Sequence, residues 1–196
     1  MPELALLQGA VQRASLGESS DFDLNPSIQL PPGRKLRPAA VLIAFEPGRG
    51  VWLTKRSSHL KHHPGQIAFP GGKLDPTDAS LEAAALREAQ EEIGLPPDCI
   101  RIFGQLPPHE TVTGFLVTPF VGHVHRPFAA RPEAGEVDEA FTVPLPHLLD
   151  AGRYSIQSRL WQGQVRRYYA VPWGPYYVWG ATARILYRLA AGASSP

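Results

Sequence analysis

The stretch from Gly71 to Leu95 constrains this chain more than any other, because it joins two glycines, a loop and a carboxylate-rich helix. Asp78 or Ser80 can begin the helix, since a short side-chain oxygen accepts a hydrogen bond from an unpaired backbone N–H there. The alanines and leucines that follow favour a helix. Gly94 is placed where a left-handed residue would end it. The sequence therefore predicts a loop, a helix and a second loop.

Three glutamates of this helix, Glu88, Glu91 and Glu92, are spaced so that they project from one face. Like charges at that spacing weaken an isolated helix by about 0.2–0.5 kcal/mol per pair. Such a face is either solvated, as in most helices with an EAQEE segment, or it binds a cation. Oxygen ligands suit Mg²⁺ or Mn²⁺. With the paired glycines and the neighbouring Arg87, which can orient or partly neutralise the carboxylates, we expect a metal site.

The sequence here resembles the Nudix box, whose usual form is G-x5-E-x7-R-E-U-x-E-E-x-G-U with U apolar. The matching residues are Gly72 and the run Arg87-Glu88-Ala89-Gln90-Glu91-Glu92-Ile93-Gly94-Leu95. The second half matches at every specified position. In the first half Asp78 stands where the box has glutamate, and Arg87 follows nine residues later instead of eight. That glutamate helps to hold the loop and helix together in the family, and Asp78 or Glu82 is the candidate substitute.

Length and composition bound the rest. A chain of 196 residues predicts one domain with appended termini: an N-terminal helix and arm over residues 1–37, a Nudix domain over 38–190 and a tail over 191–196. A net charge of +1 gives no global field for nucleic acid or membrane binding. The one cysteine, Cys99, excludes an internal disulfide framework and is expected to be a buried filler. No apolar run approaches the ~20 residues of a membrane span, and no signal-peptide pattern opens the chain. We expect a soluble, cytoplasmic protein.

Hydrophobic patterning predicts the remaining elements. An amphipathic helix is expected over residues 3–16 and an irregular arm over 18–37. Strands are expected at 39–45 and 51–55, paired as a hairpin, then at 100–106, 115–125 and 140–143, with a second hairpin at 153–157 and 164–171. A short helix is expected at 144–150. Residues 177–189 resemble the closing helix of one branch of the Nudix family, which implies a helix there with Ile185, Leu186 and Leu189 in the core.

The loop over residues 56–70 is basic and carries three histidines. Zinc is not expected, because no cysteine or third well-spaced ligand accompanies the pair His62 and His63. The loop is typical either of a solvated surface or of an anion-binding segment, since Arg and Lys pair with phosphate oxygens. With its neighbours it is similar to the motif L-L-T-x-R-[SA]-x3-R-x3-G-x3-F-P-G-G of the coenzyme A (CoA) pyrophosphatase branch of the Nudix family, carried here by Leu53-Thr54-Lys55-Arg56, Lys61, Gly65-Gln66 and Phe69-Pro70-Gly71-Gly72. Trp52 and Lys61 depart from it. The longer spacing within the box is common in this branch.

The resemblance implies roles for these residues. Glu88 and Glu92 are the expected main metal ligands, Glu91 a further ligand or a base, and Gly72 a carbonyl ligand, while Arg87 orients the carboxylates. A carboxylate from the loop over 127–139 is expected to complete the metal site or act as general base, with Glu136 the first choice and Glu139 the second. Arg56, Lys61 and the backbone of Gly65 and Gln66 are expected to bind substrate phosphates.

Other positions carry alternatives. His109 and Glu110 lie in a loop from which either can reach the site, and surface placement is the preferred interpretation. The run Arg166 to Tyr169 alternates basic and aromatic residues, which is typical of a half-exposed strand and also of a surface that stacks a base or binds phosphate. Trp179 is expected to pack and not to contact a ligand.

The family resemblance implies an α/β/α sandwich around a mixed β-sheet, an α/β (α+β) class, and a pyrophosphatase that uses Mg²⁺ or Mn²⁺. In the branch named above the substrate is CoA or a CoA derivative, cleaved to adenosine 3′,5′-bisphosphate and 4′-phosphopantetheine. The alternatives are a Nudix pyrophosphatase for ADP-ribose, dinucleotides or nucleoside triphosphates, and a nucleotide-binding module without hydrolysis. The expected partner is a small molecule, and the sequence leaves the oligomeric state open, a homodimer included.

Overall fold

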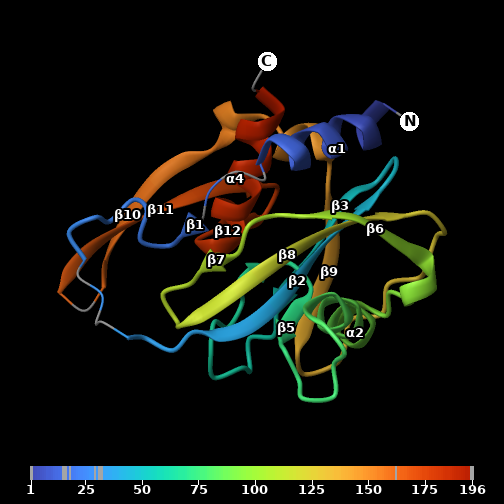
Figure 1. The fold of residues 1–196 in the computed structure, drawn as a ribbon, viewed down its shortest axis with the longest axis horizontal. Helices are drawn as coiled ribbons and strands as arrows, with labels where there is room; N and C mark the ends of the chain where they lie inside the picture. Colours follow the sequence, from blue (N-terminus) through green and yellow to red (C-terminus); the bar gives the residue numbers. More distant parts are fainter. Residues whose placement is uncertain are drawn as a thin grey trace.

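The computed structural model describes residues 2–14, 17, 19–28, 30, 33–161 and 163–194. Within that part of the chain, the strands form a nine-stranded sheet and a separate three-stranded sheet (Figure 1). The larger sheet contains β1 (Ser19–Ser20), β2 (Arg37–Glu46), β3 (Gly50–Arg56), β4 (Ile67–Ala68), β5 (Gly71–Lys73), β6 (Ile100–Gln105), β7 (His109–Glu110), β8 (Phe115–Val124) and β9 (Val137–Val143). The smaller sheet contains β10 (Ser155–Trp161), β11 (Gln164–Trp173) and β12 (Tyr176–Trp179).

Four α-helices complete the described fold: α1 (Pro2–Ala14), α2 (Leu81–Ile93), α3 (Leu145–Leu148) and α4 (Ala181–Ser194). The N-terminal helix, the box helix and the short helix after residue 144 lie where the sequence predicts them. Two single 3₁₀ turns cover Pro97–Cys99 and Ala151–Arg153. In the described part of the chain no helix is long and apolar enough to cross a membrane.

Strand β2 is the centre of the larger sheet. It runs parallel to β8, with Arg37 opposite Phe115 and Phe45 opposite His123, and antiparallel to β3 and β5. The sheet is therefore mixed. Because side chains alternate along a strand, successive buried residues of β2 enter different cores: Ile43 packs in one cluster and Leu42 in the other.

These two cores give the protein three layers. On one face of the larger sheet, α1, α4 and the smaller sheet surround Ile43 and share one apolar cluster. On the other face, α2 covers Leu42 through its buried alanines. Figure 1 shows α1 and α4 together on one side of the sheet and α2 on the opposite side. The expected α/β/α sandwich around a mixed sheet is confirmed, and the three-stranded sheet is an addition to it.

The closing helix begins later than the sequence predicts. Residues Tyr176–Trp179 form β12, and α4 starts at Ala181. Aromatic and β-branched side chains favour a strand, and Trp179 pairs with Ala170 of β11. Gly180 then turns the chain with a φ of +67°, a conformation that favours glycine. The core stripe of Ile185, Leu186 and Leu189 is buried as expected.

The tail predicted over residues 191–196 is helical as far as Ser194. Gly192 lets this end of α4 lie close to α1, because a Cβ at residue 192 would lie 2.6 Å from the carbonyl oxygen of Ala10. The two helices nearest the chain ends thus pack closely against one another. Arg13 and Arg188 add hydrogen bonds from side chain to backbone across this contact.

Two strand predictions also need correction. Strand β9 begins at Val137 and not at residue 140, and it pairs with β3 from Val51 to Arg56. The expected hairpin of β2 with β3 is short, because only Phe45 and Glu46 of β2 pair with β3. Their strands separate after the turn, and β3 takes β9 as its main neighbour.

His109 is fully buried, so its predicted surface position is wrong. Its Nδ1 atom lies 2.9 Å from Ser19 Oγ and its Nε2 atom 3.1 Å from Asp21 Oδ1. Ser19 is itself buried in β1, which pairs with β7. The imidazole therefore fastens the N-terminal arm to the larger sheet. Glu110 forms an ion pair with Arg34 of the same arm.

Candidate active site

The box helix α2 is fixed at both ends by short-range contacts. Ser80, not Asp78, is its N-cap: Ser80 Oγ accepts a hydrogen bond of 3.1 Å from the Ala83 N–H. Gly94 ends the helix in the left-handed conformation with a φ of 70°. Between them, alanines Ala84, Ala85 and Ala89 are completely buried. Their small side chains let the helix lie close to β2 and β5.

The paired glycines let strand β5 lie directly beneath the carboxylates of α2. Gly71 and Gly72 lie in β5 opposite Val41 and Ala40 of β2. A Cβ on Gly71 would lie 2.4 Å from the Ala40 carbonyl oxygen, and Gly71 has a φ of +152°. A Cβ on Gly72 would lie 2.3 Å from Oε1 of Glu88. Any larger residue at 72 would displace that carboxylate.

Arg87 connects the acidic residues. Its Nε and Nη2 atoms donate to the two oxygens of Asp78 at 2.9 and 3.0 Å. Its Nη1 donates to Glu91 at 2.8 Å, and its Nη2 also contacts Glu88 at 3.1 Å. The Arg87 guanidinium lowers the pKa of Asp78, and the Asp78 hydrogen bonds raise the pKa of Arg87. Asp78 thus ties the loop to the helix, and Glu82 makes no such contact among the described residues.

Glu92 is the buried member of the acidic set. Glu92 is only 4% exposed, and its Oε2 accepts a 3.2 Å hydrogen bond from the Gly71 N–H. Burial raises the pKa of Glu92 to about 8, and the nearby charges of Glu88 and Glu136 act in the same direction. The Gly71 N–H and the charge of Arg56 oppose that shift. Burial likewise raises the pKa of Glu88, against the lowering effect of Arg87.

Glu136 reaches this group from a distant part of the sequence. The segment before β9 is attached to the end of α2, because the Arg131 N–H donates to Ile93 O and the Glu133 N–H to Glu92 O. The Ser57 N–H donates to the Glu136 carbonyl oxygen at 2.8 Å. These contacts bring Glu136 beside Glu88 and Glu92, whose pKa values its charge raises. Glu139, the second choice, instead accepts a hydrogen bond from the Tyr176 hydroxyl.

A cleft of about 1030 Å³ opens over these residues. Its acidic end is lined by Glu88, Glu92 and Glu136, and its basic side chains come from Arg37, Arg56, Lys73 and Arg87. Gln66 and Gly72 also line it. The cleft therefore combines carboxylates that can hold cations with cations that can pair with phosphate oxygens.

The other predicted site residues lie elsewhere. The carboxylate of Glu91 is 55% exposed, is held by Arg87 and is absent from the cleft lining. Lys61 is exposed and does not line the cleft. The backbone N–H groups of Gly65 and Gln66 donate to Arg56 O and His63 O within the loop, so they are not directed at a ligand. Of these two residues, only Gln66 lines the cleft.

Sequence reasoning missed the far end of the cleft. The guanidinium of Arg37 lies 3.9 Å from the ring centroid of Phe115, and Val112, Thr113 and Val117 continue that wall. Residues 37 and 115 meet because β2 and β8 are parallel neighbours. No local sequence pattern predicts that β2 and β8 pair. The basic residue just before the first buried strand is the one signal that could have been considered.

The residues present suit a divalent cation at the acidic end. Three carboxylates from two segments line one wall, and buried Glu92 has a single hydrogen bond within the described residues. A bound cation would offset the burial of that charge. In the described part of the chain, however, no three acidic, histidine or cysteine side chains already form a ligand set. Side-chain adjustment of Glu88, Glu92 or Glu136 would therefore accompany binding.

Comparison with known proteins assigns this arrangement to a class. The family model of the NUDIX domain matches residues 35–160, so the chain belongs to the Nudix family of hydrolases. The "Uncharacterized Nudix hydrolase NudL" of Salmonella paratyphi B is 47% identical to it over 156 residues, which are 79% of this chain and 81% of that protein. NudL of Salmonella newport gives the same values.

Solved structures agree at the level of the fold. The MutT protein of Methanosarcina mazei Go1 has a TM-score of 0.54 at 21% identity, covering 83% of this chain and 99% of that one. A MutT/nudix family protein of Enterococcus faecalis has a TM-score of 0.50 at 14% identity, covering 84% and 64%. At these identities the likeness concerns the arrangement of sheet and helices.

Proposed function

We propose that this protein is a divalent-metal-dependent pyrophosphatase that cleaves CoA and CoA derivatives to adenosine 3′,5′-bisphosphate and 4′-phosphopantetheine. One observation carries the proposal: Arg56 and Gln66, from the loop that resembles the CoA branch, line the same cleft as Glu88 and Glu92 of the box. The cleft of about 1030 Å³ is also large enough for an extended dinucleotide-like substrate. The resemblance of residues 53–72 supplies the choice of CoA.

The chain's own residues have separable tasks in this reaction. Glu88 and Glu92, with the Gly72 carbonyl, would hold Mg²⁺ or Mn²⁺. Arg87, anchored by Asp78, positions Glu88, and the Gly71 N–H positions Glu92. A bound divalent ion would neutralise pyrophosphate charge and acidify the attacking water. Arg56 pairs with a substrate phosphate.

Glu136 is the better candidate for the base that accepts a proton from water. It lines the cleft, whereas the Glu91 carboxylate is held by Arg87 outside the lining. A base must come within hydrogen-bond reach of the proton it removes. The intact carboxylate set also favours hydrolysis over a module that only binds nucleotides. A cytoplasmic location would supply both CoA and the reducing conditions that suit the single Cys99.

The test is to incubate the purified protein with Mg²⁺ or Mn²⁺ and, in parallel, CoA, ADP-ribose, NADH and dATP, and to separate the products by chromatography. We expect release of adenosine 3′,5′-bisphosphate from CoA well above turnover of the others. Turnover of the others without CoA would retain pyrophosphatase chemistry and reject the CoA assignment. Failure to cleave any of them, in protein with a normal melting curve, would favour a nucleotide-binding module.

A further inference from the structure

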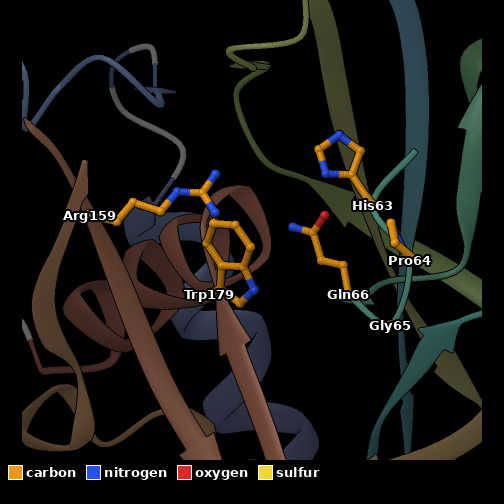
Figure 2. Close-up of a pocket in the computed structure, with 6 residues that line it drawn as sticks. All are labelled: His63, Pro64, Gly65, Gln66, Arg159 and Trp179. Carbon is orange, nitrogen blue, oxygen red and sulfur yellow. The ribbon is translucent and has the colours of Figure 1, made fainter. Parts of the chain in front are cut away.

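A second cavity of about 270 Å³ lies between the loop after β3 and the smaller sheet. Its lining consists of His63, Pro64, Gly65, Gln66, Arg159 and Trp179. Figure 2 shows Arg159 and Trp179, from β10 and β12, on one side of this cavity and Gln66 and His63 on the other. His63 and Gln66 also line the main cleft, so the two cavities share a wall.

On the side of the smaller sheet, this cavity is lined by a cation that lies over an aromatic ring. The Arg159 guanidinium lies 4.5 Å from the ring centroid of Trp179, and the Tyr168 ring lies 5.2 Å from the same indole. The register of the smaller sheet produces this group, because Ala170 pairs with Trp179 and side chains two residues apart share a face. A guanidinium stacked on a ring is partly fixed, and its in-plane N–H groups still point outward as a planar fork.

The charges around the cavity are unbalanced. Arg159 is directly opposite Arg166 in the antiparallel pair of β10 and β11, and like charges in that position destabilise a sheet. None of the six lining residues is acidic, and Arg159 belongs to none of the ion pairs within the described residues. Arg56 and His62 add positive charge close to His63, and the negative charge of Asp21 acts on both His63 and Arg166 and offsets part of it. An anion is the ligand that would relieve this arrangement.

We propose that this cavity binds a phosphate monoester on the nucleoside end of the substrate, with Arg159 pairing with the phosphate and the Gln66 amide donating to it. This inference rests on the proposed function. One ribose of CoA carries the pyrophosphate at its 5′ carbon and a phosphate monoester at its 3′ carbon. Two anionic groups on opposite sides of one sugar need two neighbouring anion sites. The wall of His63 and Gln66 separates two such sites here.

Titration calorimetry of adenosine 3′,5′-bisphosphate and adenosine 5′-monophosphate, in one magnesium-containing buffer, tests the cavity directly. The wild-type protein should bind the bisphosphate more tightly. Arg159→Gln should weaken bisphosphate binding about tenfold or more, since a charge-assisted hydrogen bond is lost, and should leave monophosphate binding unchanged. Arg159→Lys, which retains the charge without the fork, should give an intermediate value and serves if the glutamine variant does not fold.

The matched control is Arg167→Gln, on the same hairpin, because Arg167 is exposed and faces the other side of the sheet from Arg159. It should bind both nucleotides as the wild type does. The assignment is overturned if the wild type shows no preference for the bisphosphate. It is also overturned if Arg159→Gln weakens both nucleotides equally or neither, or if Arg167→Gln has the same effect as Arg159→Gln.

Hydrolysis measured on the same variants separates this inference from the proposed function. Arg159→Gln should raise KM for CoA and leave KM for dephospho-CoA, which lacks the 3′-phosphate, unchanged. Suppose that the wild-type protein does not cleave CoA, and that its preference for the bisphosphate is absent from Arg159→Gln. The cavity assignment then stands and the proposed function fails. If CoA is cleaved with the same KM in both proteins, the function stands and the cavity assignment fails.

Discussion

Arg87 and Asp78 make a two-point contact, with Nε 2.9 Å from Oδ1 and Nη2 3.0 Å from Oδ2. The same guanidinium holds Glu88 and Glu91, so the position of three carboxylates depends on one planar cation. Asp78 stands where the Nudix box has a glutamate. The structure shows how a shorter acid can tie the loop to the helix when the following arginine is one residue further along.

We therefore expect Arg87→Lys to reduce kcat about tenfold or more with little effect on KM, because lysine retains the charge but cannot form the fork. Steady-state kinetics with the preferred substrate would measure this. Arg126→Lys, at an exposed ion pair with Asp98, is the control and should behave as the wild type. A normal kcat for Arg87→Lys would show that charge alone is enough at this position.

Glu92→Gln and Glu88→Gln should each lower turnover about 100-fold or more, since both remove a proposed ligand for the divalent ion. Glu82→Gln is the matched control, because Glu82 is exposed in the first turn of the same helix. Far-ultraviolet circular dichroism should show the same fold in all three variants. Near-wild-type turnover in Glu92→Gln would remove that residue from the metal site.

The raised pKa of Glu92 predicts how stability changes with pH in the metal-free protein. The folded state binds this proton more tightly than the unfolded state, whose carboxyl titrates near 4.5. The contribution of this proton to the free energy of unfolding is therefore fully present below about pH 4.5, and it is lost as the pH rises towards about 8. Urea midpoints measured in a chelator at intervals of pH should fall over that range.

Two comparisons isolate Glu92 within that pH profile. Glu92→Gln should flatten the fall, because the amide does not titrate. Mg²⁺ should raise the midpoint most at the alkaline end, where the carboxylate is charged. Parallel profiles for the wild type and Glu92→Gln would contradict the assignment of the shift to this group.

Gly72→Ala should reduce kcat strongly with a small loss of stability, because its Cβ would lie 2.3 Å from Glu88 Oε1. Gly72 does not have a positive φ, so alanine causes no backbone strain there. A double-mutant cycle provides the check. In a Glu88→Ala background, Gly72→Ala should cost little more activity, whereas additive losses would mean that the methyl group acts on something other than Glu88.

Arg56 and Lys61 should differ in their contribution to substrate binding. Arg56→Gln should raise KM about tenfold or more, because this cation lines the cleft. Lys61→Ala should leave KM close to the wild-type value, because Lys61 is exposed and away from the lining. A larger effect from Lys61 would indicate that the loop moves towards the substrate when it binds.

Short-range features of the site were predictable from the sequence. The end of the helix at Gly94, the shared face of the acidic residues and a cap at Asp78 or Ser80, of which the structure has Ser80, all depend on spacings within one helix. The close approach of Gly72 to Glu88 was not predicted, because it depends on how β5 packs against α2. The mixed sheet and its helical layers followed from the family resemblance, and not from periodicity.

The relative placement of residues that lie far apart in the sequence was harder to predict. The wall formed by Arg37 and Phe115 requires knowing that β2 and β8 are neighbours. The exposure of Lys61 depends on how the loop folds on itself, with the Gly65 N–H directed back to Arg56. Residues 177–179 were expected to be helical from the family resemblance, and pairing with β11 decides in favour of a strand. Each outcome is determined by tertiary contacts that a local pattern does not contain.

The parallel pairing of β2 with β8 also has a consequence for folding. It joins residues 37–45 to residues 115–123, so the entire box is synthesised before the central strand acquires its longest neighbour. Pairings between segments so distant in the chain form slowly compared with local helices. A nascent chain that ends before residue 115 contains the glutamates of α2 but has no completed sheet on which to display them. The candidate active-site cleft, whose lining extends to Glu136, can therefore form only after both the box and β8 have been synthesised.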